Sequence, residues 1–303
     1  MNYLELTLSC NGRTLRIGAG ADGRRHELGI TKVEGLESSE LEITAVDNAL
    51  VDGAHVEGKR ILKRPIHIEA SFRDGENDRI RRQRVIQFFN PKYAGVLTVS
   101  NCGVTRKIGY ELEGWSFVKT TVHGRLAFAA DLICPSPYFQ HTDDFGRNLA
   151  ETTRQLAFPW RVLVKKAAVS EPYKGLALRG QITGYRRLSG QVALANDGDA
   201  PTPLRIQFVA ARGIVKNPKI TLAGTSKYIR VVTDLAQGDV LLVDTDERHQ
   251  VIELNGENAY HRIDRMSEPF KLEPGGNALE YDADEGYMNL DVRLYYAPLY
   301  LGV

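Results

Sequence analysis

Alternation of apolar and polar residues is the feature that most constrains the fold of this chain. Residues 4–8 alternate Leu with polar residues, and the same pattern returns at 15–17. Between these runs lies Asn11-Gly12, a dipeptide that favours the tight turn of a β-hairpin because both residues tolerate positive φ. A period of two places successive side chains on opposite faces of a sheet. The sequence therefore predicts a mainly β protein that begins with a hairpin.

The same period continues through the first half of the chain. Further strands are expected at 41–46, 64–72, 95–100, 106–117 and 124–134. The stretch 47–60 is rich in Gly and Asp and is expected to be a loop.

One segment, 76–91, has the period of a helix instead. Four apolar residues are expected on one stripe: Ile80, Val85, Phe88 and Phe89. Three arginines fall largely off that stripe: Arg79, Arg82 and Arg84. Asn90-Pro91 ends the segment, since a residue before proline avoids the α region. We expect a single helix whose basic outer face is solvated or meets an acidic partner.

The second half consists of many short alternating segments. Their spacing of about ten residues is typical of an antiparallel sandwich or barrel. A second hairpin turn is expected at Asn255-Gly256. The stretch 286–303 is apolar and aromatic, whereas chain ends are usually polar, so we expect it to pack against another part of the fold.

Composition excludes several classes of protein. The 303 residues include 39 Lys and Arg against 38 Asp and Glu, a balance that gives no electrostatic case for binding nucleic acid or an anionic membrane. The first residues lack a signal-peptide pattern, and no apolar run approaches the ~20 residues of a membrane span. The odd number of cysteines argues against a disulfide framework. We expect a soluble protein that folds in a reducing cytoplasm.

Few side chains form a sequence pattern that is typical of a catalytic or metal-binding site. The histidines are scattered and form no metal-ligand pair: His26, His55, His67, His123, His141, His249 and His261. Carboxylates gather at 243–249 and 281–286, where they could form an acid and base pair for glycoside cleavage or a Ca²⁺ site. Both stretches also suit solvated turns, which is the interpretation we favour. The sequence predicts no catalytic residue, no cofactor and no metal.

The stretch 131–139, DLICPSPYF, allows three interpretations: a reactive thiol, a proline-rich docking peptide or a domain boundary. Cys134 shares its strand parity with four apolar residues, which favours a buried thiol. Two prolines then end the strand by removing backbone donors. We interpret the stretch as a structural boundary motif made of Cys134, Pro135, Pro137, Tyr138 and Phe139.

Eight stretches of the chain, taken in order, resemble the distal tail proteins of siphoviruses. They are 52–72, 81–100, 106–117, 131–139, 196–208, 217–224, 238–245 and 268–279. The resemblance covers nearly the whole chain. It implies an N-terminal tail-tube-like β-sandwich with one flanking helix, formed by 1–141 and 286–303. It also implies a linker at 142–160 and a C-terminal galectin-like β-sandwich at 161–285.

The resemblance further implies a structural role in the virion, without catalysis. Six copies would form a ring at the distal end of the phage tail, and DNA would pass through its channel. One face would join the tail-tube protein, and the other would hold the tail-tip or tail-associated lysin protein, with receptor-binding or baseplate proteins as further partners. Assembly would take place in the cytoplasm of the bacterial host, with no membrane and no sequence-specific nucleic acid as partner.

Two other functions stay open at this point. The second sandwich could be a carbohydrate-binding module for host adhesion, which would need an exposed aromatic platform. The tyrosines near this sandwich do not cluster in sequence but could still meet in the fold: Tyr173, Tyr185, Tyr228 and Tyr260. The acidic stretches could instead belong to a glycoside hydrolase, with Asp244 or Asp246 as an essential residue. A shared fold alone does not decide between such functions.

Overall fold

A computed structural model describes most of the chain, at residues 3–47, 52–73, 78–118, 125–142, 145–148, 152–154, 184–186 and 191–303. The described part is mainly β, with one α-helix, as the sequence predicts. The chain divides into two compact units. The first contains Met1–Asp144, Asp197–Thr202 and Ala297–Val303, and the second contains Phe145–Asn196 and Pro203–Tyr296.

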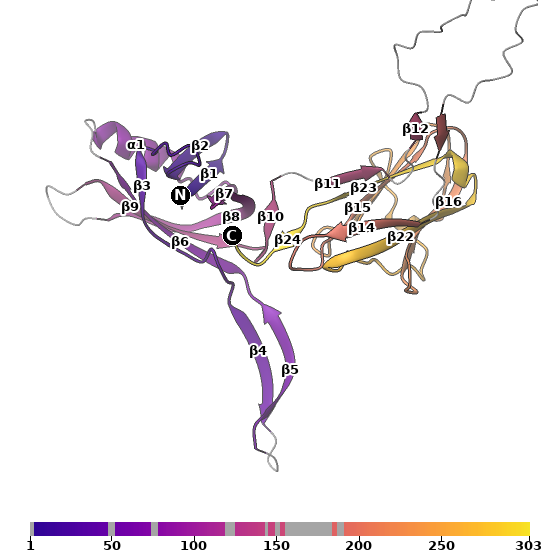
Figure 1. The fold of residues 1–303 in the computed structure, drawn as a ribbon, viewed down its shortest axis with the longest axis horizontal. Helices are drawn as coiled ribbons and strands as arrows, with labels where there is room; N and C mark the ends of the chain where they lie inside the picture. Colours follow the sequence, from indigo (N-terminus) through magenta and orange to yellow (C-terminus); the bar gives the residue numbers. More distant parts are fainter. Residues whose placement is uncertain are drawn as a thin grey trace, which may run out of the picture. The chain divides into compact units, whose positions relative to one another are not determined.

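The first unit is built on one large sheet (Figure 1). Its strands are β1 (Leu4–Cys10), β2 (Arg13–Gly18), β3 (Leu28–Glu34), β6 (Arg64–Phe72), β7 (Gly95–Asn101), β8 (Val104–Val118), β9 (Ala127–Cys134), β10 (Phe139–His141) and β24 (Leu299–Tyr300). They follow the order β24-β10-β8-β7-β1-β2-β3-β6-β9, and β8 also pairs with β9. The long β8 pairs with β7 along its first half and with β9 along its second, so seven strands close on themselves.

Local sequence explains why these strands form. Asn11 and Gly12 have φ values of 46° and 72°, the left-handed conformations that the expected β1–β2 turn requires. Along each strand, alternate apolar residues point into one core, including Leu6, Ile68 and Phe128. The parity predicted for 126–134 is confirmed, since the side chains at 128, 130, 132 and 134 are all buried.

The helix α1 (Asp78–Phe88) contributes to the same core. Val85, Phe88 and the following Phe89 are buried, but Ile80 is 67% exposed, so its expected place on the apolar stripe is wrong. The helix turns by about 100° per residue, which puts Ile80 roughly 140° around the helix from Val85. Only one narrow stripe of α1 therefore faces the sheet.

A two-stranded arm leaves this unit between β3 and β6 (Figure 1). It consists of β4 (Leu41–Asp47) and β5 (Ala54–Ile61), paired antiparallel. The strand at 41–46 is confirmed, whereas the loop expected over 47–60 is wrong because its second half, from Ala54 on, belongs to β5. The arm has no buried face, so its strands need not show the alternation that would have marked them in the sequence.

The second unit is a sandwich of two sheets around one core. One sheet has the order β11-β23-β15-β19-β20-β21, and the other β14-β22-β16-β17 with β18 beside β16. The strands are β11 (Phe145–Asn148), β14 (Gln191–Asn196), β15 (Arg205–Ala210), β16 (Val215–Leu222), β17 (Tyr228–Arg230), β18 (Asp234–Leu235), β19 (Val240–Asp244), β20 (Val251–Leu254), β21 (Glu257–Asn258), β22 (Gly275–Glu285) and β23 (Leu290–Tyr296). Phe208 and Val292 from the first sheet and Ile220 and Leu279 from the second share the core.

Short elements complete this unit. They are the strands β12 (Thr152–Arg154) and β13 (Gly184–Arg186), which pair with each other, and the 3-10 turns η1 (Tyr260–Arg262) and η2 (Tyr287–Asn289). The expected Asn255-Gly256 turn is present, with φ values of 52° and 84°.

The chain returns to the first unit later than expected. The sequence assigns all of 286–303 to the first domain, but β23 pairs with β15 and β11 inside the second sandwich. Its alternate residues Leu290, Val292 and Leu294 are buried in that core, which fixes the strand there. Only Ala297–Val303, here called the return segment, belongs to the first unit. Of the expected linker 142–160, the strand β11 belongs to the second unit, and 155–160 lie outside the described residues.

Candidate assembly interface

The arm carries exposed apolar side chains on one face. Cross-strand partners share one face of a ribbon, and here Leu41 lies opposite Ile61, and Ala45 opposite Val56. Leu41, Ile43 and Val56 are between 43% and 52% exposed. An isolated two-stranded hairpin is only marginally stable in water. A ribbon of this kind is therefore suited to bury its apolar face against another protein.

The strand edges of the arm are also available. Among the described residues β4 and β5 pair only with each other, so the outer edge of each strand is open. An open edge presents a row of N–H and C=O groups to which another chain can add. The ion pair between Arg60 and Glu42, at 2.8 Å, places charge on the ribbon and disfavours unspecific pairing.

A buried arginine, Arg64, holds the base of the arm. Its side chain is fully buried, and its guanidinium donates three hydrogen bonds to backbone carbonyls. Nε donates to Pro137 at 2.8 Å, Nη1 to Gly35 at 2.7 Å, and Nη2 to Leu301. The guanidinium also lies 5.0 Å from the ring centroid of Phe139. Burial lowers the pKa of Arg64 from its ordinary value.

The return segment closes over this arginine. Strand β24 pairs with β10 through Tyr300 opposite Phe139. Arg106 of β8 stacks 3.6 Å from the Tyr300 ring centroid and donates to the Gly302 carbonyl. A Cβ at Gly302 would lie 2.5 Å from the Glu37 oxygen, so a larger residue would push the segment away from the arm's base. The base of the arm, β10 and the return segment therefore meet around Arg64. We call Arg64 and its three acceptor residues Gly35, Pro137 and Leu301 the node.

The residues of the boundary motif lie around the same node. Cys134 pairs with Arg64 across β9 and β6 and is fully buried, and Phe139 is fully buried as well. Pro137 is buried, Tyr138 is half-buried, and Pro135 is exposed. Strand β9 ends at Cys134, directly before Pro135. That the motif marks the exit of the first domain stays a prediction. Its link to Arg64 had no signal in the sequence.

The cysteines are expected to differ sharply in reactivity. Burial raises the pKa of Cys134 to about 12 and also raises that of Cys10, whereas Cys102 is exposed in the turn between β7 and β8. Because the thiolate is the reactive form, iodoacetamide should label Cys102 in the folded protein and reach the other two only after unfolding in urea. Peptide mass spectrometry measures this. Equal labelling rates for Cys134 and Cys102 in the native protein would contradict the interpretation of Cys134 as a buried residue.

The acidic residues considered for glycoside cleavage or Ca²⁺ binding form hydrogen bonds and ion pairs with neighbouring strands and turns. Asp244 accepts hydrogen bonds from Arg205 and from the backbone N–H of Asp246. Asp284 accepts from Asn217 at 2.7 Å and from Arg230, and both contacts lower its pKa. A general acid needs the opposite shift. Both acidic stretches thus act as turn and ion-pair residues where the structure describes them.

Of the four tyrosines considered for a sugar-binding platform, Tyr228 and Tyr260 have described side chains, and each has its own polar partner. Lys219 lies 4.5 Å over the ring of Tyr228, whose hydroxyl donates to Asp264. The hydroxyl of Tyr260 donates to Gln250 in a different part of the same unit. Tyr173 lies outside the described residues, and nothing is described of the side chain of Tyr185.

Two histidines, His26 and His67, pair with carboxylates. His67 contacts Asp131 through Nδ1 at 2.6 Å and Glu69 through Nε2 at 3.1 Å, and these two hydrogen bonds raise its pKa. His26 contacts Glu5, and His123 lies outside the described residues. Within the part of the chain that the structure covers, no three His, Cys, Asp or Glu side chains are placed to hold a metal ion. That same part contains no helix of the length and apolarity that crossing a membrane requires.

Comparisons with known proteins point to phage tails. Residues 197–300 match the family described as siphovirus-type tail component, C-terminal domain. The crystal structure of SPP1 Dit, described as a paradigm of hub adsorption apparatus in phages that infect Gram-positive bacteria, matches with a TM-score of 0.65 and 13% identity over 98% of this chain and 99% of that one. A chain of the phage P2 baseplate in its activated conformation with Ca matches with a TM-score of 0.53 and 11% identity over 98% of each chain.

No curated protein matches the sequence. At these identities the two solved structures show a shared fold, and the family match adds a sequence relationship for about a third of the chain. These findings agree with the resemblance to siphovirus distal tail proteins: residues 197–300 match the siphovirus-type tail component family, and the chain as a whole has the fold of SPP1 Dit.

Proposed function

We propose that the protein is a structural hub at the distal end of a phage tail, in which six copies join head to tail in a closed ring. The arm carries this proposal, because it leaves the closed sheet with exposed Leu41, Ile43 and Val56 and two open strand edges. A heterologous contact, in which one surface of a copy meets a different surface of the next, generates a ring when the rotation closes. The arm of one copy packing on the first unit of its neighbour is such a contact.

The rest of the proposal follows from this ring. One face would bind the tail-tube protein, and the other the tail-tip or tail-associated lysin protein and further baseplate proteins, while DNA passes through the channel. The second sandwich, proposed to be galectin-like, would serve as a scaffold. The protein would act in the virion without catalysis, after assembly in the cytoplasm of the host.

Mass measurement tests the ring. Light scattering on the purified protein should give six times the 33.8 kDa of one chain, and negative-stain images should show closed rings. The measurement should be repeated with the tail-tip protein added, because a partner can favour the assembled state. A strict monomer at every concentration, with and without that partner, would overturn the proposal.

A further inference from the structure

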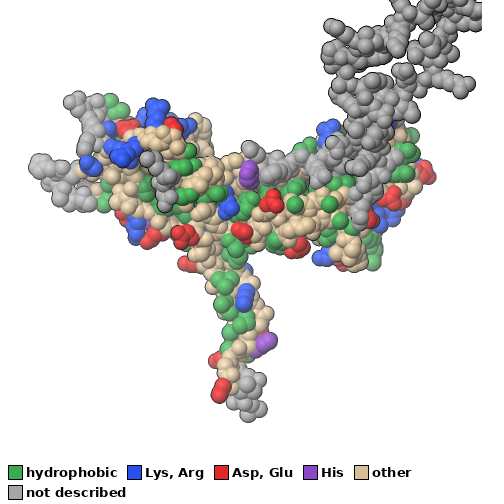
Figure 2. Space-filling model, in the orientation of Figure 1, with side chains coloured by type: hydrophobic (Ala, Val, Ile, Leu, Met, Phe, Trp, Pro, Cys, Tyr) green, Lys and Arg blue, Asp and Glu red, His purple; other side chains and the backbone are tan. Residues whose placement is uncertain are grey.

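The surface formed by β2, the 18–28 loop and α1 carries several arginines without a carboxylate partner among the described residues. Four of them have no ion pair among the described residues: Arg13, Arg16, Arg24 and Arg25. They border two adjoining hollows of about 600 Å³ each, which share Arg16, His26 and Glu27 in their walls. We call these four arginines and the two hollows the basic face. Figure 2 shows Lys and Arg side chains gathered over this end of the first unit.

The carboxylates near the basic face are already engaged. Glu27 accepts from Arg81 at 2.8 Å and from Arg84 at 2.9 Å. Glu5 contacts His26 at 2.7 Å, and Asp22 accepts from the backbone N–H of Arg24. The four arginines thus keep donors that suit incoming carboxylates. Separated guanidinium groups of this kind can each bind one carboxylate of an incoming protein segment.

The far half of the arm has the complementary charge. Between Ala45 and Gly58 the sequence contains three carboxylates and neither Lys nor Arg. Asp47, Asp52 and Glu57 are exposed and have no ion pair among the described residues. We call these three residues the acidic tip. Figure 2 shows Asp and Glu side chains at this end of the arm.

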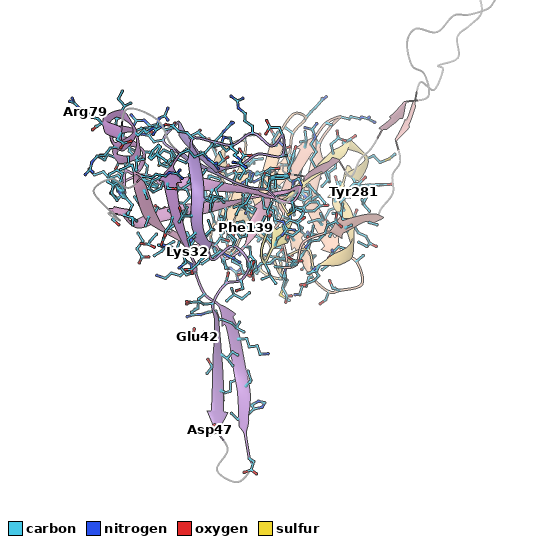
Figure 3. The ribbon with its side chains drawn as sticks, turned by 60° about the vertical axis from the view of Figure 1, so that its left-hand side comes forward. Lys32, Glu42, Asp47, Arg79, Phe139 and Tyr281 are labelled. Carbon is cyan, nitrogen blue, oxygen red and sulfur yellow. The ribbon has the colours of Figure 1, made fainter. Side chains whose placement is uncertain are left out.

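One copy does not bring the two surfaces together. Both belong to the first unit, yet the labelled Arg79 on α1 and Asp47 on β4 lie at opposite ends of it in Figure 3, and Figure 1 shows the same separation of α1 from the end of β4. Their charges can be satisfied by a second copy. A contact between different surfaces of successive copies is also the kind that closes into a ring.

We propose that the acidic tip of one copy binds the basic face of the next copy. The ligand of the two hollows is then a set of carboxylates presented by a β-ribbon of the same protein. This inference rests on the proposed ring and assigns the surface that receives the arm. Because the tip and face are exposed, the contact is governed by charge and weakens as salt is raised.

Charge reversal with complementation tests the contact. The tip variant is Asp52→Lys/Glu57→Lys, and the face variant is Arg16→Glu/Arg24→Glu. Each alone places like charges at every interface and should raise the concentration needed for half-assembly by about tenfold or more. An equal mixture should restore assembly, because in a ring of alternating variants each reversed tip meets a reversed face and each normal tip meets a normal face. Light scattering and electron microscopy measure this, and native mass spectrometry of the mixture should show three copies of each variant.

Matched controls separate charge pairing from general effects. Glu257→Lys/Glu268→Lys adds the same charge as the tip variant at exposed positions of the second unit and should leave assembly unchanged. Thermal unfolding should show that both reversal variants fold like the wild type. If the wild type forms rings and the variants form them equally well, the inference is wrong and the ring stands. If the face variant alone assembles normally but loses affinity for duplex DNA, the basic face binds phosphate instead. A wild type that never assembles would instead overturn the proposed function.

Discussion

Replacing Arg64 with Ala is expected to lower the free energy of unfolding of the first unit by about 3–5 kcal/mol. The substitution removes three hydrogen bonds from a charged donor, so the carbonyls of Gly35, Pro137 and Leu301 lose this partner in buried or partly buried positions. Hydrogen bonds to charged groups are worth about 1.5–3 kcal/mol each when a partner is lost. Urea unfolding in a Trp160→Phe background measures the effect, because Trp115 of the first unit is then the remaining tryptophan.

Two variants control for the loss of an arginine as such. Arg60→Ala removes an exposed guanidinium from the arm and its ion pair with Glu42, and should cost no more than about 1 kcal/mol. Arg64→Lys keeps the charge but lacks the forked guanidinium that reaches three carbonyls. Its loss of unfolding free energy should therefore lie between those of Arg64→Ala and Arg60→Ala. If Arg64→Ala proves as mild as Arg60→Ala, the node around Arg64 does not hold the first unit together.

Substituting the apolar face of the arm is expected to have a second large effect, on the assembly of the ring. The variant Leu41→Thr/Ile43→Thr/Val56→Thr keeps side chains that favour strands, but removes apolar contacts worth about 1 kcal/mol or more each when buried in an interface. The loss recurs at every contact of the proposed ring, so light scattering should detect monomers at concentrations where the wild type is assembled. Because these residues are exposed in one copy, its free energy of unfolding should change by less than about 0.5 kcal/mol per substitution.

The matched control is Ile214→Thr/Met266→Thr, at positions of the second unit that are 63% and 73% exposed. It should assemble like the wild type. Rings that form normally from the arm variant would show that the apolar face of the arm is not the contact, even if the protein is a hexamer.

The parts of the fold that the sequence predicts are those that depend on near neighbours. The turns at Asn11-Gly12 and Asn255-Gly256 follow from the backbone preferences of two residues. The strand leading to Cys134 follows from one-sided burial, which leaves a period of two. The helix is recognisable because it too is buried on one side, which leaves a period of about 3.6 residues. Ile80 shows that an apolar residue lies on the buried stripe only if its spacing from the other apolar residues fits that period.

The parts that the sequence does not predict depend on distant partners. Arg64 looks like an ordinary surface residue because its acceptors lie 29, 73 and 237 positions away. The β5 half of the arm looks like a loop in the sequence because neither of its faces is buried within one copy. The exposed Leu41, Ile43 and Val56 would be covered by a second copy in the proposed ring, and periodicity within one chain does not report such a partner.

The position of the return segment in the chain sets an order of events during synthesis. A ribosome delivers the whole second unit before Ala297 emerges, and until then Arg64 lacks its Leu301 acceptor and β10 lacks β24. The first unit is thus completed by the return segment, which is translated after the whole of the second unit. A polypeptide interrupted anywhere before this segment would lack both the Leu301 acceptor of Arg64 and the β24 partner of β10, so the base of its arm would be incompletely bonded.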